Sequence, residues 1–319
     1  MDDIRVATAQ FEARDGDKDY NLGRIAALTR EAASRGAQLA LFHELSVTGY
    51  TWLERLTREE IAALAEPWPS GPSVGVLAET ARSCGCWISA GFVEIENGRL
   101  YNAQAVVSPD GPVTRHRKIH EFVSEHLDCG DSYTLFDAYG WKFGVLTCYD
   151  NNLPENARVT AMLGAGVILM PHVTGCLPSP APGRGVVAPE IWRNRHRDPV
   201  RCRQEFDGPK GRGWITKWLP ARAWENGVYA VYANVLGEEG GTVKPGGSMI
   251  VNPFGEIAAE CRSLEDEIVT ATLIPEAREL ASGGSYIRGR RPLLYAKLVE
   301  PNPHTAHSKQ PEVYWKKVR

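Results

Sequence analysis

Short apolar stretches typical of buried strands alternate along this chain with stretches whose apolar spacing is typical of helices. The first pair is a strand-like stretch at residues 4–11 and a helical pattern at residues 22–33. The later strand-like stretches are 39–42, 87–93, 104–107, 143–147, 167–170, 229–233, 248–252 and 268–273, and the later helical ones are 74–82, 156–163 and 214–226. No low-complexity segment interrupts them, so the pattern predicts one layered α/β domain.

Composition excludes several other classes of protein. The 319 residues are 43% hydrophobic and carry a formal net charge of −3, as in ordinary globular chains, and we expect no nucleic-acid partner. The first residues lack the pattern of a signal peptide, and no apolar run approaches the roughly 18 residues of a membrane span. Seven cysteines, an odd number, are scattered along the chain. We therefore expect reduced thiols, a cytoplasmic location and no membrane partner.

Three chemically reactive residues stand at the ends of strand-like stretches. They are Glu44 after residues 39–42, Lys118 after residues 113–117 and Cys148 after residues 143–147. A helical segment begins at Pro154, and a cysteine at a strand-to-helix turn can expose its sulfur in a crevice that favours the thiolate. A lone cysteine is more often a buried structural residue. The glutamate and lysine in comparable positions instead favour a catalytic cysteine.

The residues around these positions resemble the nitrilase superfamily of carbon–nitrogen hydrolases. The resemblance covers residues 4–274 and rests on five blocks in the family's order: Phe42-His43-Glu44-Leu45 with Thr48-Gly49-Tyr50, Arg117-Lys118-Ile119-His120, Cys148-Tyr149-Asp150 with Pro154-Glu155 and Arg158, residues 222–229, and residues 247–255. It implies a four-layer αββα sandwich that needs no cofactor. It also implies that Cys148 is the nucleophile, Glu44 the general base and Lys118 the cation that stabilises the oxyanion.

The resemblance also implies a second glutamate between the lysine and the cysteine, which holds the lysine and positions the substrate. Glu121 and Glu125 are the candidates. We prefer Glu125 because its position seven residues after Lys118 resembles the nitrilase branch. Many relatives carry a proline soon after the lysine, whereas here His120 is followed by Glu121.

Three further residues are predicted to bind substrate. Tyr50 belongs to the first block, Tyr149 follows the nucleophile, and His172 follows the strand-like stretch 167–170, although a core histidine is the alternative there. A metal site is also considered, since His116 and His120 are four residues apart. That spacing brings ligands together on a helix, whereas residues 113–119 have a strand-like pattern, so no metal is expected.

The long segment at residues 171–213 is rich in proline, glycine and arginine. A loop of this length inside a compact domain is usually functional or disordered. Its apolar residues, such as Trp192 and Phe206, argue against full disorder. We expect this insertion to form a wall of the substrate pocket, with a surface excursion used in subunit packing as the alternative.

Residues 1–275 are assigned to the hydrolase domain and residues 276–319 to a C-terminal extension. Family relatives associate through helices next to the cysteine strand, and residues 156–163 offer apolar contacts here. The extension holds Val313, Tyr314 and Trp315, which a solvated terminus would not usually keep. We therefore expect a homodimer or larger homo-oligomer, with the extension packed on a neighbouring subunit.

The residues after the nucleophile carry the hint about reaction class. Tyr149-Asp150 and Pro154-Glu155 look like the amidase and carbamoylase branches, whereas nitrilases typically follow their cysteine with Trp-Glu. We therefore predict hydrolysis of a small amide or N-carbamoyl compound, with release of ammonia through a thioester acyl-enzyme. The alternatives are a nitrilase that converts a nitrile to a carboxylic acid and ammonia, and a catalytically silent binding protein of the same fold.

Overall fold

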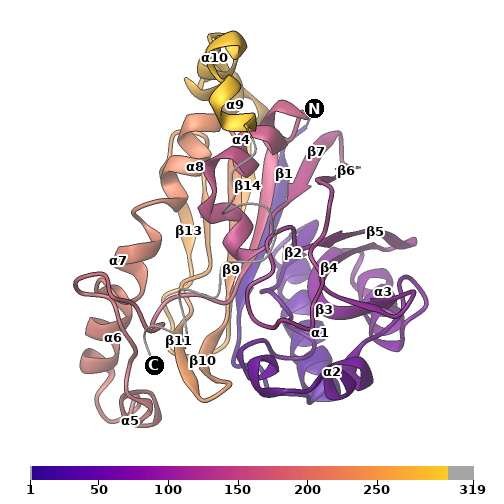
Figure 1. Ribbon diagram of the computed structural model, residues 1–319, viewed down its shortest axis with the longest axis vertical. Helices are drawn as coiled ribbons and strands as arrows, with labels where there is room; N and C mark the ends of the chain where they lie inside the picture. The colour runs from indigo at the N-terminus through magenta and orange to yellow at the C-terminus, as the bar shows by residue number, and fades with distance from the viewer. Residues whose placement is uncertain (1, 301–319) are drawn as a thin grey trace.

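The computed structural model describes residues 2–300, in which two six-stranded sheets face each other (Figure 1). The strands of the first sheet are β1 (Ile4–Gln10), β2 (Leu39–Leu41), β3 (Trp87–Glu96), β4 (Arg99–Ser108), β5 (Gly111–Arg117) and β14 (Glu267–Leu273). Those of the second are β6 (Thr134–Ala138), β7 (Trp141–Val145), β8 (Val167–His172), β9 (Tyr229–Asn234), β12 (Met249–Val251) and β13 (Ile257–Glu260). A separate two-stranded sheet consists of β10 (Leu236–Glu239) and β11 (Thr242–Pro245).

Both large sheets have a parallel centre and antiparallel margins. The first has the order β14-β1-β2-β3-β4-β5, with β1, β2 and β3 parallel. The second has the order β13-β12-β9-β8-β7-β6, with β7, β8 and β9 parallel. The carboxyl ends of parallel strands meet at one edge of a sheet, and this is where ligands commonly bind in α/β proteins.

Helices cover the outer face of each sheet. Apolar residues of α1 (Lys18–Ser34) and α3 (Pro72–Cys84) pack against the first sheet, and those of α4 (Pro154–Met162) and α8 (Leu219–Asn226) pack against the second. A third apolar cluster lies between the sheets and includes Val6 and Leu41 from one and Phe143 and Leu169 from the other. The predicted four-layer αββα sandwich is confirmed.

The insertion at residues 171–213 contains two helices that its composition, rich in proline and glycine, did not predict. These are α5 (Pro189–Arg193) and α6 (Pro199–Asp207), and both begin with a proline, which is tolerated in the first turn because its missing N–H has no partner there. The rings of Trp192 and Phe206 stack at 5.9 Å in a small core that also includes Leu236 of β10 and Val243 of β11. The predicted helix at residues 214–226 is instead two helices, α7 (Arg212–Ile215) and α8, and Pro220 lies in the first turn of α8.

The remaining elements lie at the margins of the sandwich. After β2 come η1 (Thr51–Arg55) and α2 (Arg58–Leu64), and after β14 come α9 (Pro275–Leu280), α10 (Gly283–Arg288), η3 (Pro292–Leu294) and η4 (Ala296–Val299). The ring of Tyr286 in α10 lies 5.3 Å from that of Trp224 in α8. The apolar tail residues Val313, Tyr314 and Trp315 lie outside the described residues. No helix in residues 2–300 is both long and apolar enough to cross a bilayer.

Candidate active site

Glu44, Lys118 and Cys148 meet between the two sheets. Glu44 follows β2, Lys118 follows β5 and Cys148 follows β7, so loops after three strands carry the three residues. The Nζ of Lys118 lies 2.7 Å from Oε1 of Glu44, and both side chains are fully buried. The negative charge of Glu44 also acts on the thiol of Cys148 and raises its pKa. The structure thus brings together the three residues that the sequence predicted as catalytic.

Two further groups hold the Glu44 carboxylate in place. The Asn102 side chain in β4 donates to Oε1 at 2.7 Å, and the Val173 N–H donates to Oε2 at 3.2 Å. Burial raises the pKa of Glu44, while the Lys118 charge opposes that rise. A carboxylate whose pKa lies above its ordinary value is a better proton acceptor, which suits a general base.

Lys118 remains a cation despite its burial. Desolvation alone would lower its pKa, but the negative charge of Glu44 and of neighbouring groups raises it well above the ordinary value. Its Nζ also lies 3.4 Å from the Tyr50 hydroxyl. A fixed positive charge in a water-poor site stabilises negative charge that develops on a substrate.

Cys148 occupies a constrained position at the turn after β7. Its φ of 49° is in the left-handed region that L-residues rarely adopt. Residues with such strained backbone angles cluster at active sites. Its Sγ lies 3.9 Å from the Val173 carbonyl oxygen. Burial and the Glu44 charge raise the pKa of the thiol, although Lys118 opposes this. The resting sulfur therefore carries its proton, which Glu44, the predicted general base, accepts during attack.

Cys148 opens onto a cavity of about 510 Å³. The predicted residues Tyr50 and Tyr149 line it, and the Tyr149 ring stacks on Phe122 at a centroid distance of 5.5 Å. The insertion contributes Leu177, Pro178 and Arg184 to its wall. The other lining residues are Thr51, Glu54, Val123, Asn152, Val173, Thr174, Trp214 and Thr242.

Of the two candidates for the second glutamate, Glu121 is the one whose charge acts on the buried pair. Glu121 is only 2% exposed, and its negative charge acts on both Lys118 and Glu44. Its Oε1 accepts the N–H groups of Phe122 and Val123, so the loop itself fixes the carboxylate. Glu125, which the spacing favoured, lies on the exposed surface of the same loop. The structure thus favours Glu121 over Glu125, because the chain buries the Glu121 side chain immediately after His120.

His172 lies in the core beneath the nucleophile turn and not in the cavity wall. Its Nε2 is 3.0 Å from the Asn151 side-chain nitrogen, and its ring packs 4.8 Å from that of Tyr232. Burial and the Lys118 charge lower its pKa to about 3, so the ring is neutral. The structure thus favours the alternative of a core histidine over direct contact with substrate.

Asp150 connects the lysine loop to the nucleophile turn, a role that the sequence analysis missed. Its buried carboxylate accepts the backbone N–H groups of Thr147 at 3.1 Å and of His120 at 2.8 Å. The imidazoles of His116 and His120 lie 3.3 and 3.0 Å from its oxygens. Both histidines are thereby committed to Asp150, and residues 2–300 contain no group of His, Cys, Asp and Glu suited to a metal ion.

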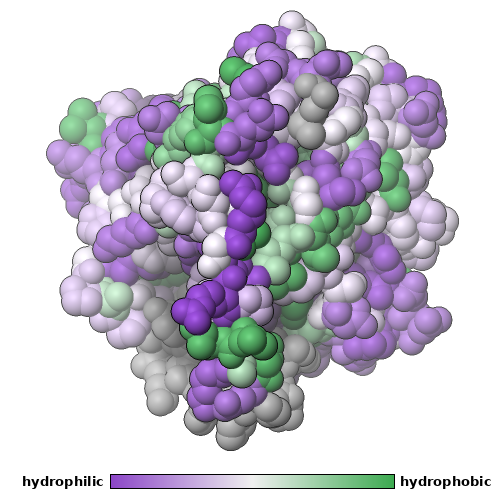
Figure 2. All heavy atoms as spheres, turned by 90° about the horizontal axis from the view of Figure 1, so that it is seen from above, coloured by the Kyte–Doolittle hydropathy of each residue, from purple (hydrophilic) through white to green (hydrophobic). Residues whose placement is uncertain are grey.

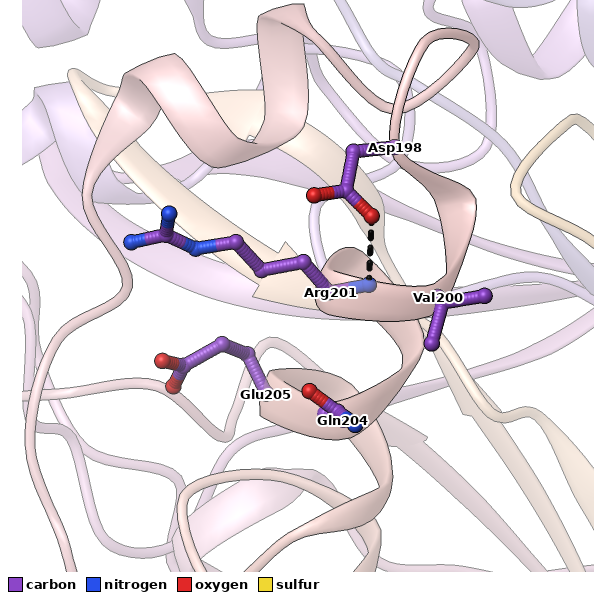
Figure 3. A pocket seen from close by; sticks show the side chains of 5 residues that line it. All are labelled: Asp198, Val200, Arg201, Gln204 and Glu205. Atoms are coloured by element: carbon purple, nitrogen blue, oxygen red, sulfur yellow. Dashed lines mark hydrogen bonds between the residues drawn. The ribbon is translucent and has the colours of Figure 1, made fainter.

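A second hollow lies on the surface of α6 (Figure 3). Its lining residues are Asp198, Val200, Arg201, Gln204 and Glu205. Asp198 caps the helix by accepting the Arg201 N–H at 3.0 Å. The hollow is open, and none of its lining residues is a nucleophile. The cavity at Cys148 is therefore the candidate active site.

Comparisons with known proteins agree with this geometry. The carbon-nitrogen hydrolase family matches residues 5–281. A nitrilase of Pyrococcus abyssi is 32% identical over 85% of this chain and 89% of its own length, and an (R)-stereoselective amidase of a Pseudomonas species is 30% identical over 93% and 95%. A nitrilase-superfamily amidase of Nesterenkonia AN1 has a similar structure, with a TM-score of 0.69 at 23% identity over 93% of this chain and 97% of that one. This chain belongs to the carbon–nitrogen hydrolase family.

Proposed function

We propose that this enzyme hydrolyses the C–N bond of a carboxamide through a thioester on Cys148 and releases ammonia. The observation that supports this most directly is the buried Glu44–Lys118 pair, whose charges act on a cysteine that lines a cavity, Cys148. Amide hydrolysis by a cysteine needs a nucleophile, a group that moves protons and a donor for the oxyanion. The three residues supply these in that order: Cys148, Glu44 and Lys118.

The reaction proceeds in two halves. The sulfur attacks the amide carbon while Glu44 takes the thiol proton, and the resulting oxyanion is stabilised by Lys118 with the Tyr149 N–H. The intermediate collapses when Glu44 returns that proton to the departing nitrogen, which leaves as ammonia. Glu44 then takes a proton from water, whose oxygen attacks the thioester carbon, and the carboxylic acid departs as the thiol is restored.

The size of the cavity favours a substrate whose acyl group is larger than that of a short aliphatic amide. Its volume of about 510 Å³ is within the range of roughly 300–1,000 Å³ that is usual for small-molecule pockets. Phe122, Val123, Leu177 and Trp214 give it largely apolar walls. The acyl chain of the substrate would therefore lie between the loop after Lys118 and the insertion.

We propose amides as substrates, in preference to nitriles, for two reasons. Tyr149-Asp150 after the nucleophile resembles the amidase and carbamoylase branches, and the relatives include an (R)-stereoselective amidase and an omega-amidase of Xenopus laevis, the latter 31% identical. Nitrile hydrolysis is the second candidate, favoured by the nitrilase of Pyrococcus abyssi at 32% identity. N-carbamoyl compounds also present a carbonyl carbon bonded to an NH2 group, so we include them with the amides as the first candidate.

Paired kinetic measurements test both the substrate class and the role of Cys148 as the nucleophile. Ammonia release is measured from a carboxamide, its N-carbamoyl analogue and the corresponding nitrile, with wild-type protein and with Cys148→Ala. We expect the wild type to prefer the amide or carbamoyl compound, and Cys148→Ala to be inactive without loss of thermal stability. Cys84→Ala, at a partly exposed cysteine away from the cavity, is the matched control. Activity in Cys148→Ala would refute the mechanism, and a higher kcat/KM for the nitrile would favour the second candidate.

A further inference from the structure

His172 is the last residue of β8, and its fully buried side chain has no direct part in the proposed chemistry, because it does not line the cavity. Its ring packs against two aromatic side chains, with centroid distances of 4.8 Å to Tyr232 and 5.3 Å to Trp218. Close-packed neighbours of this kind leave the imidazole little freedom to rotate. One ring nitrogen, Nε2, is thereby held 3.0 Å from the side-chain nitrogen of Asn151.

Asn151 belongs to η2 (Cys148–Asn152), the turn that carries the nucleophile, and its side chain is also fully buried. Its amide nitrogen donates to the Leu146 carbonyl oxygen at 2.7 Å. This contact fixes the orientation of the amide, because only the nitrogen of the amide can donate to a carbonyl oxygen. The second N–H group of the same nitrogen is then available to Nε2 of His172.

His172 is the acceptor in this hydrogen bond. Burial and the positive charge of Lys118 lower the pKa of its imidazole to about 3, so the ring is neutral near pH 7. A neutral imidazole has one nitrogen that donates and one that accepts. Because Nε2 faces an N–H group, the proton of the ring resides on Nδ1. The bond to Asn151 therefore does not break as the pH falls through 6.5, the ordinary pKa of a histidine.

The bond between Asn151 and His172 connects the two backbone segments that meet at the sulfur. Asn151 lies three positions after Cys148 in η2, whose strained φ of 49° at Cys148 depends on support from its surroundings. His172 is followed directly by Val173, whose N–H donates to Oε2 of Glu44 at 3.2 Å. The Val173 carbonyl oxygen lies 3.9 Å from Sγ of Cys148. A shift of either segment would therefore change the separation between the sulfur and its base.

We propose that His172 and Asn151 are positioning residues, and that the hydrogen bond between them sets the place of the Cys148 sulfur relative to Glu44. This inference rests on the proposed role of Cys148 as the nucleophile and adds two residues that act through the backbone of the site. Neither side chain lines the cavity, so neither contacts the substrate. Loss of the bond should slow the chemical step, because catalysis is sensitive to small displacements of the reacting groups, and should leave substrate affinity almost unchanged.

Three substitutions of His172 separate positioning from packing. His172→Gln places an amide oxygen close to the position of Nε2, His172→Asn reaches only as far as Nδ1, and His172→Phe keeps a ring without an acceptor. With a carboxamide substrate, we expect kcat to fall by about 10- to 100-fold in His172→Asn and His172→Phe, with KM within about threefold of wild type. His172→Gln should retain at least about a third of the wild-type kcat, since it keeps the acceptor.

Two outcomes of this comparison would overturn the proposal. One is a wild-type kcat in His172→Phe, which would show that the acceptor is not needed. The other is an equal loss in all three variants, His172→Gln included, which would show that only the packing of the ring matters. Circular dichroism and thermal unfolding establish that each variant is folded before its rate is measured.

Modification of Cys148 by methyl methanethiosulfonate separates this inference from the proposed function, because it needs no amide hydrolysis. The sulfur forms a disulfide bond with the thiomethyl group of the reagent, methanesulfinate leaves, and Glu44 accepts the thiol proton. Mass spectrometry of the peptide that contains Cys148 gives the rate. We expect this rate to fall by about 10-fold or more in His172→Phe and in Asn151→Leu, and an unchanged or faster rate would overturn the proposal.

The double variant tests whether the two residues act through one contact. The modification rate of Asn151→Leu with His172→Phe should be no lower than that of Asn151→Leu alone, whereas losses that multiply would show independent effects and overturn the proposal. Thr29→Val is the control, since it removes a buried hydrogen bond to the Ile25 carbonyl oxygen within α1 and should leave the rate unchanged. A wild type that hydrolyses no amide would refute the proposed function, while the modification rates would still test the positioning of Cys148.

Discussion

Glu44 and Lys118 are 74 positions apart in the sequence, yet they form a fully buried ion pair with a distance of 2.7 Å between Oε1 and Nζ. A buried pair of this kind is stable only while both partners are present, because removal of one leaves the other charged and desolvated. The charges of both partners, the proton acceptor Glu44 and the cation Lys118, also act on the sulfur of Cys148. Stability and catalysis therefore depend on the same contact.

Replacement of Lys118 should therefore affect both properties. We expect Lys118→Ala to slow the chemical step by about 100-fold or more, as does the loss of an oxyanion donor. The free energy of unfolding should fall by about 3–5 kcal/mol, since Glu44 loses its buried partner. Single-turnover kinetics and urea denaturation measure the two effects. Lys142→Ala, which breaks an exposed pair with Asp137, is the control and should cost less than about 1 kcal/mol without affecting rate.

The acid limb of the pH–rate profile should report on Glu44. Its pKa is raised above the ordinary value of 4.5, chiefly by burial, and the carboxylate form is the active base. Activity should therefore be lost as the pH falls through this raised pKa, so the acid limb of kcat/KM lies above pH 4.5. A profile that stays flat down to pH 4.5 in a protein that remains folded would contradict this assignment.

Glu121 and Glu125 offer a matched pair on one loop. Glu121→Gln removes a buried charge that acts on Lys118, so we expect kcat/KM to fall by about 10-fold or more, on the scale of a lost charged hydrogen bond. Glu125→Gln changes an exposed residue and should leave kcat/KM within about twofold of wild type. Steady-state kinetics on both variants measures the difference. The reverse ranking would restore Glu125 as the second glutamate.

Asp150 should contribute to stability in a pH-dependent way. Burial alone would raise its pKa, but the hydrogen bonds from His116 and His120 hold it well below the ordinary value. A depressed carboxyl pKa stabilises the fold above the unfolded value near 3.8 and loses that contribution as the pH falls through the folded value. We expect Asp150→Asn to cost about 3 kcal/mol at pH 7. The difference from wild type should narrow below about pH 4 in chemical denaturation.

The exposed Asp137 provides the comparison for Asp150. Its side chain is 72% exposed in a surface pair with Lys142, so Asp137→Asn should change the unfolding free energy by less than about 1 kcal/mol at any pH. A cost for Asp150→Asn that is equally small at pH 7 would show that the carboxylate does not hold the two loops together.

We also propose that the chain forms a homodimer or larger homo-oligomer. Figure 2, seen from the end of the molecule that carries α10, shows apolar surface among hydrophilic residues. The exposed apolar side chains of the protein include Met162, Leu163, Leu293 and Leu298. Exposed apolar groups of this kind commonly mark interfaces. Light scattering should give at least twice the monomer mass, and Met162→Glu with Leu163→Glu should lower it. A monomer at all concentrations would contradict the proposal.

The sequence alone determined the layered α/β class and the identity of the reactive residues. Strand-like and helical apolar spacing is local, so β2, β7 and α1 could be recognised from residues next to one another. Glu44, Lys118 and Cys148 could be recognised because each ends a strand within a block of familiar residues. The short β10 and β11 and the helices of the insertion were missed, since their sequences carry turn residues or too few apolar positions for a clear period.

Tertiary structure decided the contacts between segments that are distant in sequence. Which glutamate faces Lys118 depends on where one loop turns inward, and spacing does not encode that direction. Asn102 in β4 and Asp150 acquire their roles from the carboxylate and the backbone donors that other strands bring to them. The protonation of Cys148 follows from burial. Burial is a property of the packed sheets, because desolvation depends on every neighbour and not on residue order.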